Sequence, residues 1–217
     1  METHLTASQS TSQPRVGVLA IQGDYERHAA ALTEVGAIPT LVKTAEALAN
    51  VDALILPGGE STTMLKFLQR GGLLEDLRAF AAQKPVFGTC AGAILLAREV
   101  RHPSQDSLAT LDIAVERNAY GDQRDSAILT LNFNLNAFNP DETPTSAPTP
   151  LETVFIRAPR IVSTGPGVQI LAYRESFPIL VRQGKTLAAT FHPELSTDRT
   201  IHRYFLSLLA SNSQRSD

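Results

Sequence analysis

A single cysteine, Cys90, stands between two glycines in the segment Gly88-Thr89-Cys90-Ala91-Gly92. The apolar residues before this segment predict a buried strand, and the small apolar residues after it predict a helix. A nucleophile on such a sharp turn is pushed clear of the backbone, and only small residues two positions away let the turn pack. Free N–H groups at the start of the helix favour a thiolate. The segment therefore predicts a cysteine nucleophile, although many free cysteines are simply small buried hydrophobes.

A histidine and a glutamate follow a later apolar strand, in the segment Thr190-Phe191-His192-Pro193-Glu194. Residues two apart in an extended segment point the same way, so both side chains are expected to face one cleft. A thiol that attacks an acyl carbon needs a base for its proton, and the base needs an acceptor on its other ring nitrogen. Cys90, His192 and Glu194 supply these three roles. Three other histidines lack such spacing and are interpreted as surface or structural residues: His28, His102 and His202.

Paired glycines end another predicted strand, in the segment Pro57-Gly58-Gly59-Glu60-Ser61-Thr62. Such glycines let backbone N–H groups point into a cleft, as an oxyanion hole requires. The candidate donors are Gly58, Gly59 and the residue after the nucleophile, Ala91. Glu60 and Ser61 are candidates for holding polar groups of a substrate. A glycine-rich turn before a helix also suits phosphate, but the Walker lysine is missing and Glu60 would repel phosphate.

Strand and helix patterns alternate over the first hundred residues, which predicts a parallel sheet with helices on both faces. The expected strands span 15–21, 38–42, 52–56 and 86–89, and the expected helices span 25–35, 45–49, 62–70, 73–82 and 91–97. Ligands of such sheets bind outside the carboxyl ends of the strands. The loops at Gln22-Gly23, Pro57-Gly58-Gly59 and Cys90 are therefore expected to converge on one cleft.

The second half of the chain predicts strands joined by tight turns, with antiparallel pairs, and a closing amphipathic helix. The expected strands span 113–116, 154–156, 168–173, 178–182 and 186–191, and the helix spans 200–210. The prolines and threonines of residues 129–152 predict an exposed insert, which the alternating apolar residues from Leu129 to Leu135 would begin as a strand. We expect one domain over residues 15–211, with a disordered polar tail over 1–14 and a polar tail over 212–217.

Composition excludes several classes of protein. A chain of 217 residues buries roughly 70% of its unfolded surface and needs neither a disulfide nor a metal to fold. A formal net charge of −3 gives no argument for a nucleic-acid or membrane partner, and no apolar run is long enough to span a bilayer. One cysteine cannot form an internal disulfide, which suits a reducing compartment. We therefore expect a cytoplasmic protein without a metal or a cofactor.

Taken together, the motifs resemble a known family. Pro-Gly-Gly-Glu-Ser, Gly-Thr-Cys-Ala-Gly and Phe-His-Pro-Glu are similar to the motifs of class I (triad-type) glutamine amidotransferases, and most to the glutaminase subunits of pyridoxal 5′-phosphate synthase. Further matching segments are Val18-Leu19-Ala20-Ile21-Gln22-Gly23, Glu60-Ser61-Thr62-Thr63-Met64, Val115-Glu116-Arg117-Asn118 and Phe155-Ile156-Arg157-Ala158-Pro159. The resemblance covers nearly everything from Val16 to Leu209, and the tail and the insert interrupt none of the motifs.

The resemblance implies a flavodoxin-like three-layer α/β/α fold, with a mostly parallel central sheet and an antiparallel elaboration in the second half. It implies that Cys90 is the nucleophile, His192 the base and Glu194 the residue that orients the base, in a reaction that converts L-glutamine to glutamate and ammonia. The implied glutamine contacts are Gly59, Glu60, Ser61, Arg117, Ile156 and Arg157. From the residues alone, Arg117 and Arg157 are candidate forks for the substrate's α-carboxylate.

The resemblance also implies a partner, an ammonia-using synthase subunit in a hetero-oligomeric complex. That subunit makes pyridoxal phosphate, a form of vitamin B6, from ribose 5-phosphate and glyceraldehyde 3-phosphate. Three alternatives stay open. One is a cysteine hydrolase or deglycase of the intracellular-protease superfamily, in which the histidine usually follows the cysteine closely, unlike His192. The others are a non-catalytic regulatory module that kept the pocket, and a glutaminase subunit of another pathway, such as histidine biosynthesis.

Overall fold

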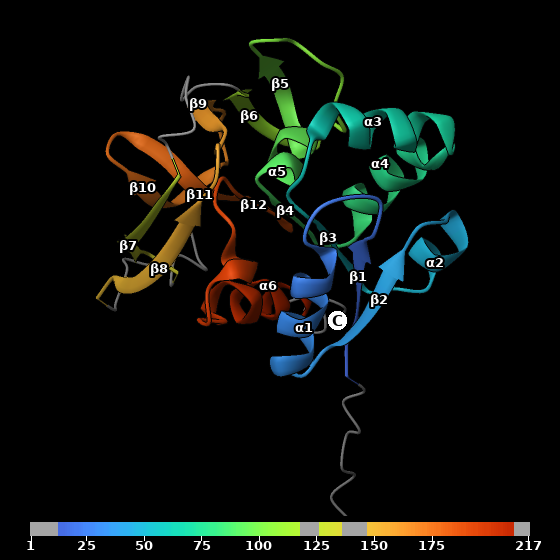
Figure 1. The fold of residues 1–217 in the computed structure, drawn as a ribbon, viewed down its shortest axis with the longest axis horizontal. Helices are drawn as coiled ribbons and strands as arrows, with labels where there is room; N and C mark the ends of the chain where they lie inside the picture. The colour runs from blue at the N-terminus through green and yellow to red at the C-terminus, as the bar shows by residue number, and fades with distance from the viewer. Residues whose placement is uncertain (1–12, 118–125, 136–146, 211–217) are drawn as a thin grey trace, which may run out of the picture.

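The computed structural model describes residues 13–117, 126–135 and 147–210. Within these ranges, nine strands form one sheet in the order β2-β1-β3-β4-β12-β11-β10-β7-β8, and β5, β6 and β9 form a second, smaller sheet (Figure 1). The tails expected over residues 1–14 and 212–217 lie almost wholly outside the described residues.

The parallel half of the main sheet consists of strands that the sequence predicts. Its members are β1 (Arg15–Leu19), β2 (Ile38–Val42), β3 (Ala53–Leu56), β4 (Val86–Thr89) and β12 (Thr186–Ala189). β3, β4 and β12 are buried throughout, as apolar strands between two helical layers are. All five strands run parallel, so their carboxyl ends meet at one edge of the sheet.

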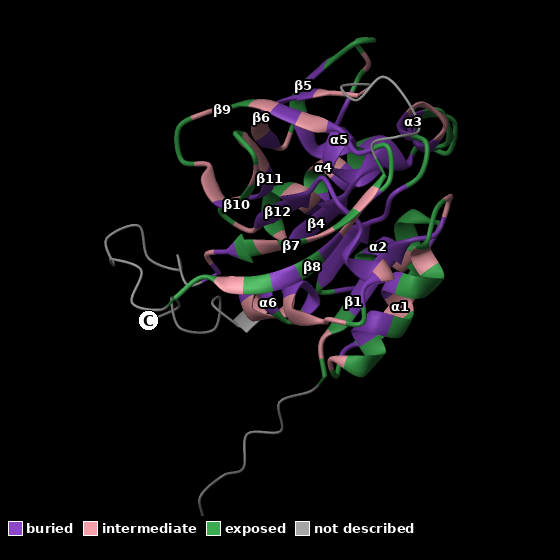
Figure 2. Ribbon diagram, turned by 60° about the vertical axis from the view of Figure 1, so that its left-hand side comes forward, coloured by how far each residue is buried: buried purple, intermediate pink, exposed green. Residues whose placement is uncertain are grey.

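Helices cover both faces of this sheet and confirm the three-layer fold. They are α1 (Tyr25–Glu34), α2 (Ala45–Ala49), α3 (Ser61–Arg70), α4 (Leu73–Gln83), α5 (Ala91–Leu96) and α6 (Thr200–Ala210). On β3, Leu54 and Leu56 pack in the core with α2, α3, α4 and α5, whereas Ala53 and Ile55 pack in the core with α1 and α6. Figure 2 shows the resulting band of burial through the strands and α5. None of the described helices is long and apolar enough to cross a membrane.

The other half of the main sheet is antiparallel. Its strands are β11 (Phe177–Gln183), β10 (Gln169–Arg174), β7 (Ala127–Phe133) and β8 (Thr149–Phe155). β7 and β8 pair from Ala127 opposite Phe155 to Phe133 opposite Thr149. Phe133 and Leu151 are buried, so both ends of the insert expected over 129–152 belong to the sheet rather than to an exposed excursion. Residues 136–146 of that insert lie outside the described residues.

The smaller sheet contains two strands that the sequence analysis did not predict. β6 (Leu111–Glu116) lies between β5 (Ala97–Arg101), to which it is parallel, and β9 (Arg160–Thr164), to which it is antiparallel. The helix expected over 91–97 ends at Leu96, and β5 begins at the next residue. β5 and β9 are edge strands that pair only with β6 in this sheet. The sequence of either segment alone does not indicate this pairing.

Candidate active site

Cys90 occupies the sharp turn between β4 and α5. Its backbone has φ 48° and ψ −103°, a conformation that costs a residue with a side chain about 1–3 kcal/mol and is concentrated at functional sites. The Cys90 N–H donates to the carbonyl oxygen of Ala189 at 2.8 Å, and the Cys90 carbonyl accepts from the N–H of Ile94 at 3.2 Å. The strained turn is thus held by β12 on one side and by α5 on the other.

The two glycines that flank this turn are required by close packing, as the sequence predicts. A Cβ atom on Gly88 would lie 2.6 Å from the carbonyl carbon of Gly92. A Cβ atom on Gly92 would lie 1.9 Å from the carbonyl oxygen of Leu56. Neither position has room for a side chain, so α5 can approach the sheet and begin directly at the thiol.

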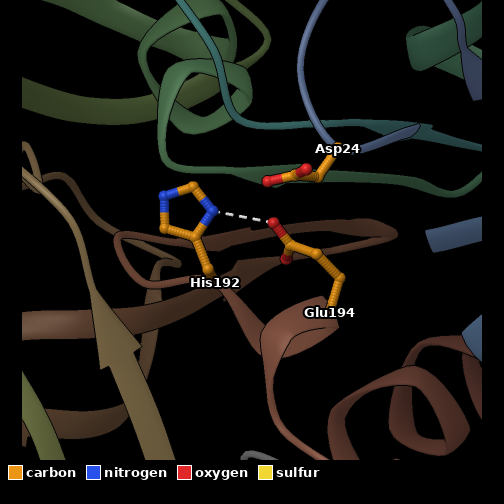
Figure 3. Close-up of side chains that lie close together, drawn as sticks. All are labelled: Asp24, His192 and Glu194. Carbon is orange, nitrogen blue, oxygen red and sulfur yellow. Dashed lines mark hydrogen bonds and ion pairs between the residues drawn. The ribbon is translucent and has the colours of Figure 1, made fainter. Parts of the chain in front are cut away.

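His192 and Glu194 come together by a different route from the one expected. β12 ends at Ala189 rather than at Phe191, and residues Pro193–Leu195 form a short 3₁₀ helix, η2. This turn folds the Glu194 carboxylate back against the imidazole, so that His192 Nδ1 lies 2.7 Å from Glu194 Oε1 (Figure 3). The expectation of an extended backbone was wrong, but the predicted contact between the two side chains is present.

Burial and hydrogen bonding set the protonation of this pair. Burial opposes a charge on His192, but hydrogen bonds with Cys90 and Glu194 outweigh it and raise the pKa of His192 to about 10. Burial likewise opposes ionisation of Glu194, yet the neighbouring His28 and His192 lower the pKa of this carboxyl. At neutral pH the pair is an imidazolium and a carboxylate. Because Nδ1 faces Glu194, Nε2 is the nitrogen left for the Cys90 thiol.

The glycine loop after β3 lies directly against this triad. A Cβ atom on Gly58 would lie 2.5 Å from Cε1 of His192 and 3.5 Å from Cβ of Cys90. A Cβ atom on Gly23 would lie 1.7 Å from the Gly58 carbonyl oxygen. The loops after β1, β3 and β4 therefore converge, as expected. Ala91 is the first residue of α5, where backbone N–H groups have no partner within the helix.

A cavity of about 140 Å³ opens beside the thiol. The residues that line it are Gly59, Glu60, Ser61, Cys90, Ile94, Arg117, Ile156 and Arg157. All six residues that the family resemblance implies as glutamine contacts are among them. The structure thus brings together segments from three distant parts of the chain, and the nucleophile faces them although it is only 8% exposed.

Charges in this cavity are partly paired with one another. Burial opposes ionisation of Glu60, but hydrogen bonds from Thr63 and Thr62 at the start of α3 lower its pKa to about 2. Arg117 Nη2 donates to Glu60 Oε1 at 3.1 Å and to Thr62 Oγ1 at 2.8 Å. Among the described residues, Arg157 has no side-chain hydrogen bond or ion pair. Of the two arginines predicted as carboxylate forks, only Arg157 has its charge unpaired within the described part of the chain.

Three residues near the triad were not among the predicted site residues: Asp24, His28 and His202. Oxygen or nitrogen atoms of Asp24, His192 and Glu194 lie within 4.8 Å of one another (Figure 3), and the last two are already joined by their hydrogen bond. His28 and His202, interpreted as surface or structural residues, are fully buried; His28 lies beside Glu194, and His202 contacts His28. One signal was present, since His28 lies four residues before Leu32 on the apolar face of a predicted helix.

Comparisons with known proteins identify the family of this chain. A model of the SNO glutamine amidotransferase family matches residues 18–211. Two relatives, each named pyridoxal 5′-phosphate synthase subunit PdxT, come from Koribacter versatilis (48% identity, covering 92% of this chain and 97% of the relative) and Solibacter usitatus (51% identity, covering 90% and 99%). A crystal structure described as a glutamine amidotransferase matches with a TM-score of 0.79 and 42% identity, covering 90% of this chain and 98% of its own. The structure of PurLQS from Thermotoga maritima, with a TM-score of 0.67, 16% identity and coverage of 91% and 100%, shares the fold. Since the family match spans all the elements that form the site, this chain belongs to the SNO glutamine amidotransferase family.

Proposed function

We propose that this chain is a glutaminase subunit that hydrolyses L-glutamine to glutamate and ammonia. The observation that carries the proposal is that Cys90, His192 and Glu194 meet beside a cavity lined by the implied glutamine contacts. Family membership and the relatives named as pyridoxal 5′-phosphate synthase subunits support it.

In the first half of the reaction, the Cys90 thiolate attacks the carbon of the glutamine side-chain amide. The C–S bond forms, and the carbonyl electron pair moves onto oxygen, where backbone N–H groups of the Gly58-Gly59 loop and Ala91 bind the oxyanion. The imidazolium of His192 donates its Nε2 proton to the departing nitrogen, so that ammonia leaves and a glutamyl thioester remains. Glu194 holds the Nδ1 proton and the ring orientation throughout.

In the second half, water hydrolyses the thioester. Neutral His192 takes a proton from the water, whose oxygen attacks the thioester carbon, and the C–S bond breaks. The imidazolium and the thiolate are thereby restored, and glutamate is released. No metal or redox cofactor is needed in this sequence, because no atom changes oxidation state, and the proton that His192 gives to ammonia is replaced by one from water.

The charges of the cavity suit the amino-acid end of glutamine. Its α-carboxylate needs a cation, and Arg157 lines the cavity with its charge unpaired among the described residues. Its α-ammonium needs an anion, and Glu60 stays ionised well below neutral pH. The Arg117 contact holds Glu60 in place for this role.

The partner that we propose is the synthase subunit of pyridoxal 5′-phosphate synthase, in a hetero-oligomeric complex in the cytoplasm. Ammonia released into bulk water at neutral pH is protonated and loses its nucleophilicity. Direct delivery to a docked synthase avoids this loss. A single cysteine, which is the nucleophile itself, suits a reducing compartment.

The test is ammonia release from glutamine, measured with and without the synthase subunit, for the wild type and a Cys90→Ala variant. Removing the nucleophile is expected to lower the rate by at least about 10³-fold. Glutamate release by the variant at the wild-type rate would reject the assignment. Covalent labelling of Cys90 by a glutamine-analogue electrophile distinguishes an enzyme from a binding module. Formation of pyridoxal phosphate with the synthase distinguishes this subunit from glutaminases of other pathways.

A further inference from the structure

Two buried histidines extend the triad into the protein interior. His28 lies on α1 and His202 lies on α6, and neither side chain is exposed to solvent. His28 Nδ1 is 3.1 Å from His202 Nε2, although 174 residues separate them in the sequence. Outside this contact, Arg199 Nε lies 2.7 Å from Glu34 Oε2 and ties the start of α6 to the end of α1. The two helices lie side by side in Figure 1.

The other nitrogen of His28 reaches the catalytic carboxylate. His28 Nε2 is 3.2 Å from Glu194 Oε2 and 3.2 Å from the hydroxyl of Thr89, the residue before the nucleophile. Among the described residues, Glu194 Oε2 accepts no hydrogen bond of regular geometry, so its contact with His28 is a close electrostatic approach, whereas the His28–Thr89 contact has hydrogen-bond geometry. Since Glu194 Oε1 faces His192, each oxygen of this buried carboxylate has an imidazole beside it.

The chemistry of the contacts assigns the protons. An ionised carboxylate oxygen can only accept, so the proton of His28 belongs on Nε2. Burial lowers the pKa of His28 and lowers that of His202 to about 3, so both rings are neutral and carry one proton each. With Nε2 protonated, His28 Nδ1 is an acceptor, and the proton between the rings belongs to His202 Nε2. The ring of His202 is packed edge-on against Phe87, which fixes its orientation.

Given the glutaminase function proposed above, we propose that His28 is a positioning residue that holds Glu194 oriented and ionised through its second oxygen, and that His202 fixes the tautomer of His28. The N–H groups then point in one direction, from His202 to His28 and from His28 toward Glu194 and Thr89, while Glu194 orients His192 against Cys90. The charged groups that act on His28 are Glu194, His192, Asp24 and Arg199. A purely structural contact would not require a donor here, because an apolar side chain fills buried space at lower cost than a polar one.

The test compares two substitutions of one residue. Gln in place of His28 keeps a donor nitrogen near the Nε2 position, whereas Leu fills the space without a donor. Ser107→Ala is the matched control, because it removes another buried hydrogen bond, from the Ser107 hydroxyl to the Ala97 carbonyl. For each variant, kcat and KM for glutamine are measured across pH on the complex with the synthase subunit, together with the unfolding midpoint.

We expect His28→Leu to lower kcat by about 10- to 100-fold, the usual effect of removing an outer-shell partner, with KM changed less than about twofold. Without the donor the pKa of Glu194 rises, so the acid limb of the pH profile moves to higher pH. His28→Gln should restore most of kcat and the position of the limb. Ser107→Ala should lower the unfolding midpoint and leave the limb unmoved. Equal impairment of the Leu and Gln variants, or an unmoved acid limb in the Leu variant, would overturn the proposal.

A measurement on the wild-type chain keeps the proposal testable if His28→Leu does not fold. Nitrogen-15 NMR of the histidine rings at neutral pH should show His28 neutral with its proton on Nε2. A proton on His28 Nδ1, or an imidazolium, would refute the proposal that His28 accepts from His202 and directs its own N–H toward Glu194. This readout also separates the two proposals, because a wild-type chain that never hydrolyses glutamine rejects the function whatever tautomer His28 has.

Discussion

Gly58 provides a direct test of where the catalytic imidazole lies. A Cβ atom at this position would be 2.5 Å from Cε1 and 3.1 Å from Nδ1 of His192. Carbon atoms in contact prefer a separation of about 3.5–4.0 Å. In Gly58→Ala the ring must therefore retreat by about 1 Å, or the loop must move away from the thiol by a similar amount.

A displacement of about 1 Å in a catalytic group costs about 10²-fold in rate, or about 2.7 kcal/mol in the activation free energy. Gly58 does not have a positive φ, so alanine is not strained by the backbone itself. The backbone N–H of residue 58 also remains. The expected result is a kcat about 100-fold below the wild type, with KM altered less than kcat.

The assay is steady-state ammonia release by the complex with the synthase subunit, alongside chemical unfolding. Gly71→Ala serves as the control, because Gly71 has helical backbone angles (φ −81°, ψ −3°) and is exposed at the end of α3. Its added Cβ would meet one backbone atom, the Phe67 carbonyl oxygen at 3.2 Å, which is a tight contact but one that does not involve His192 or Cys90. This control should retain the wild-type kcat. A Gly58→Ala variant with the wild-type kcat would refute the reasoning, because it would mean that the ring of His192 does not lie against this loop during turnover.

Two further predictions concern protonation. Replacing Glu194 by Gln removes the charge that helps raise the pKa of His192 to about 10, so the alkaline limb of kcat, where the imidazolium is lost, should move to lower pH. The value of kcat should also fall, toward the ~10⁴-fold loss seen when a triad carboxylate becomes an amide. An unmoved alkaline limb in the pH–rate profile would contradict this prediction. The unfolded chain protonates His202 near pH 6.5 but the folded chain only near 3, so stability should fall as pH drops below 6.5, by up to about 1.4 kcal/mol per pH unit. His202→Gln should reduce that slope in denaturant unfolding between pH 6.5 and 4.5, and an identical slope would contradict the lowered pKa, because it would mean that folding does not change the protonation of His202 in this range.

The local parts of the site could be predicted from the sequence because their causes are local. The strand, the small residues and the helix around Cys90 all lie within one short segment, and each of them is required by a contact inside that segment or with the adjacent strand. The buried parallel strands could likewise be predicted from the sequence, since their apolar runs are bounded by glycine and proline. Loops at the carboxyl ends of such strands converge for topological reasons alone.

The remaining parts depend on contacts between distant segments. His28 and His202 are in contact only because α1 and α6 pack on the same face of the sheet. The local sequence around either histidine does not predict this contact. The Arg117 contact with Glu60 joins residues 57 apart, so the sequence did not indicate that this candidate carboxylate-binding arginine is paired with an anion. The 3₁₀ turn at Pro193 replaced an extended segment because the chain leaves β12 two residues earlier than its apolar pattern indicates.

The pairing of β4 with β12 determines whether this site exists. The two strands are parallel, with Thr89 opposite Ala189, so the chain leaves both at the same edge and the segments carrying Cys90 and His192 emerge side by side. A slip of one residue would displace the base by about 3.3 Å and turn every side chain of the strand to the other face. The hydrogen bond from the Cys90 N–H to the Ala189 carbonyl extends this register into the strained turn itself. Nucleophile and base, 102 positions apart by their residue numbers, are therefore aligned by the backbone hydrogen bonds between β4 and β12. Any substitution that weakens this strand pairing should reduce activity even when every residue of the cavity is retained.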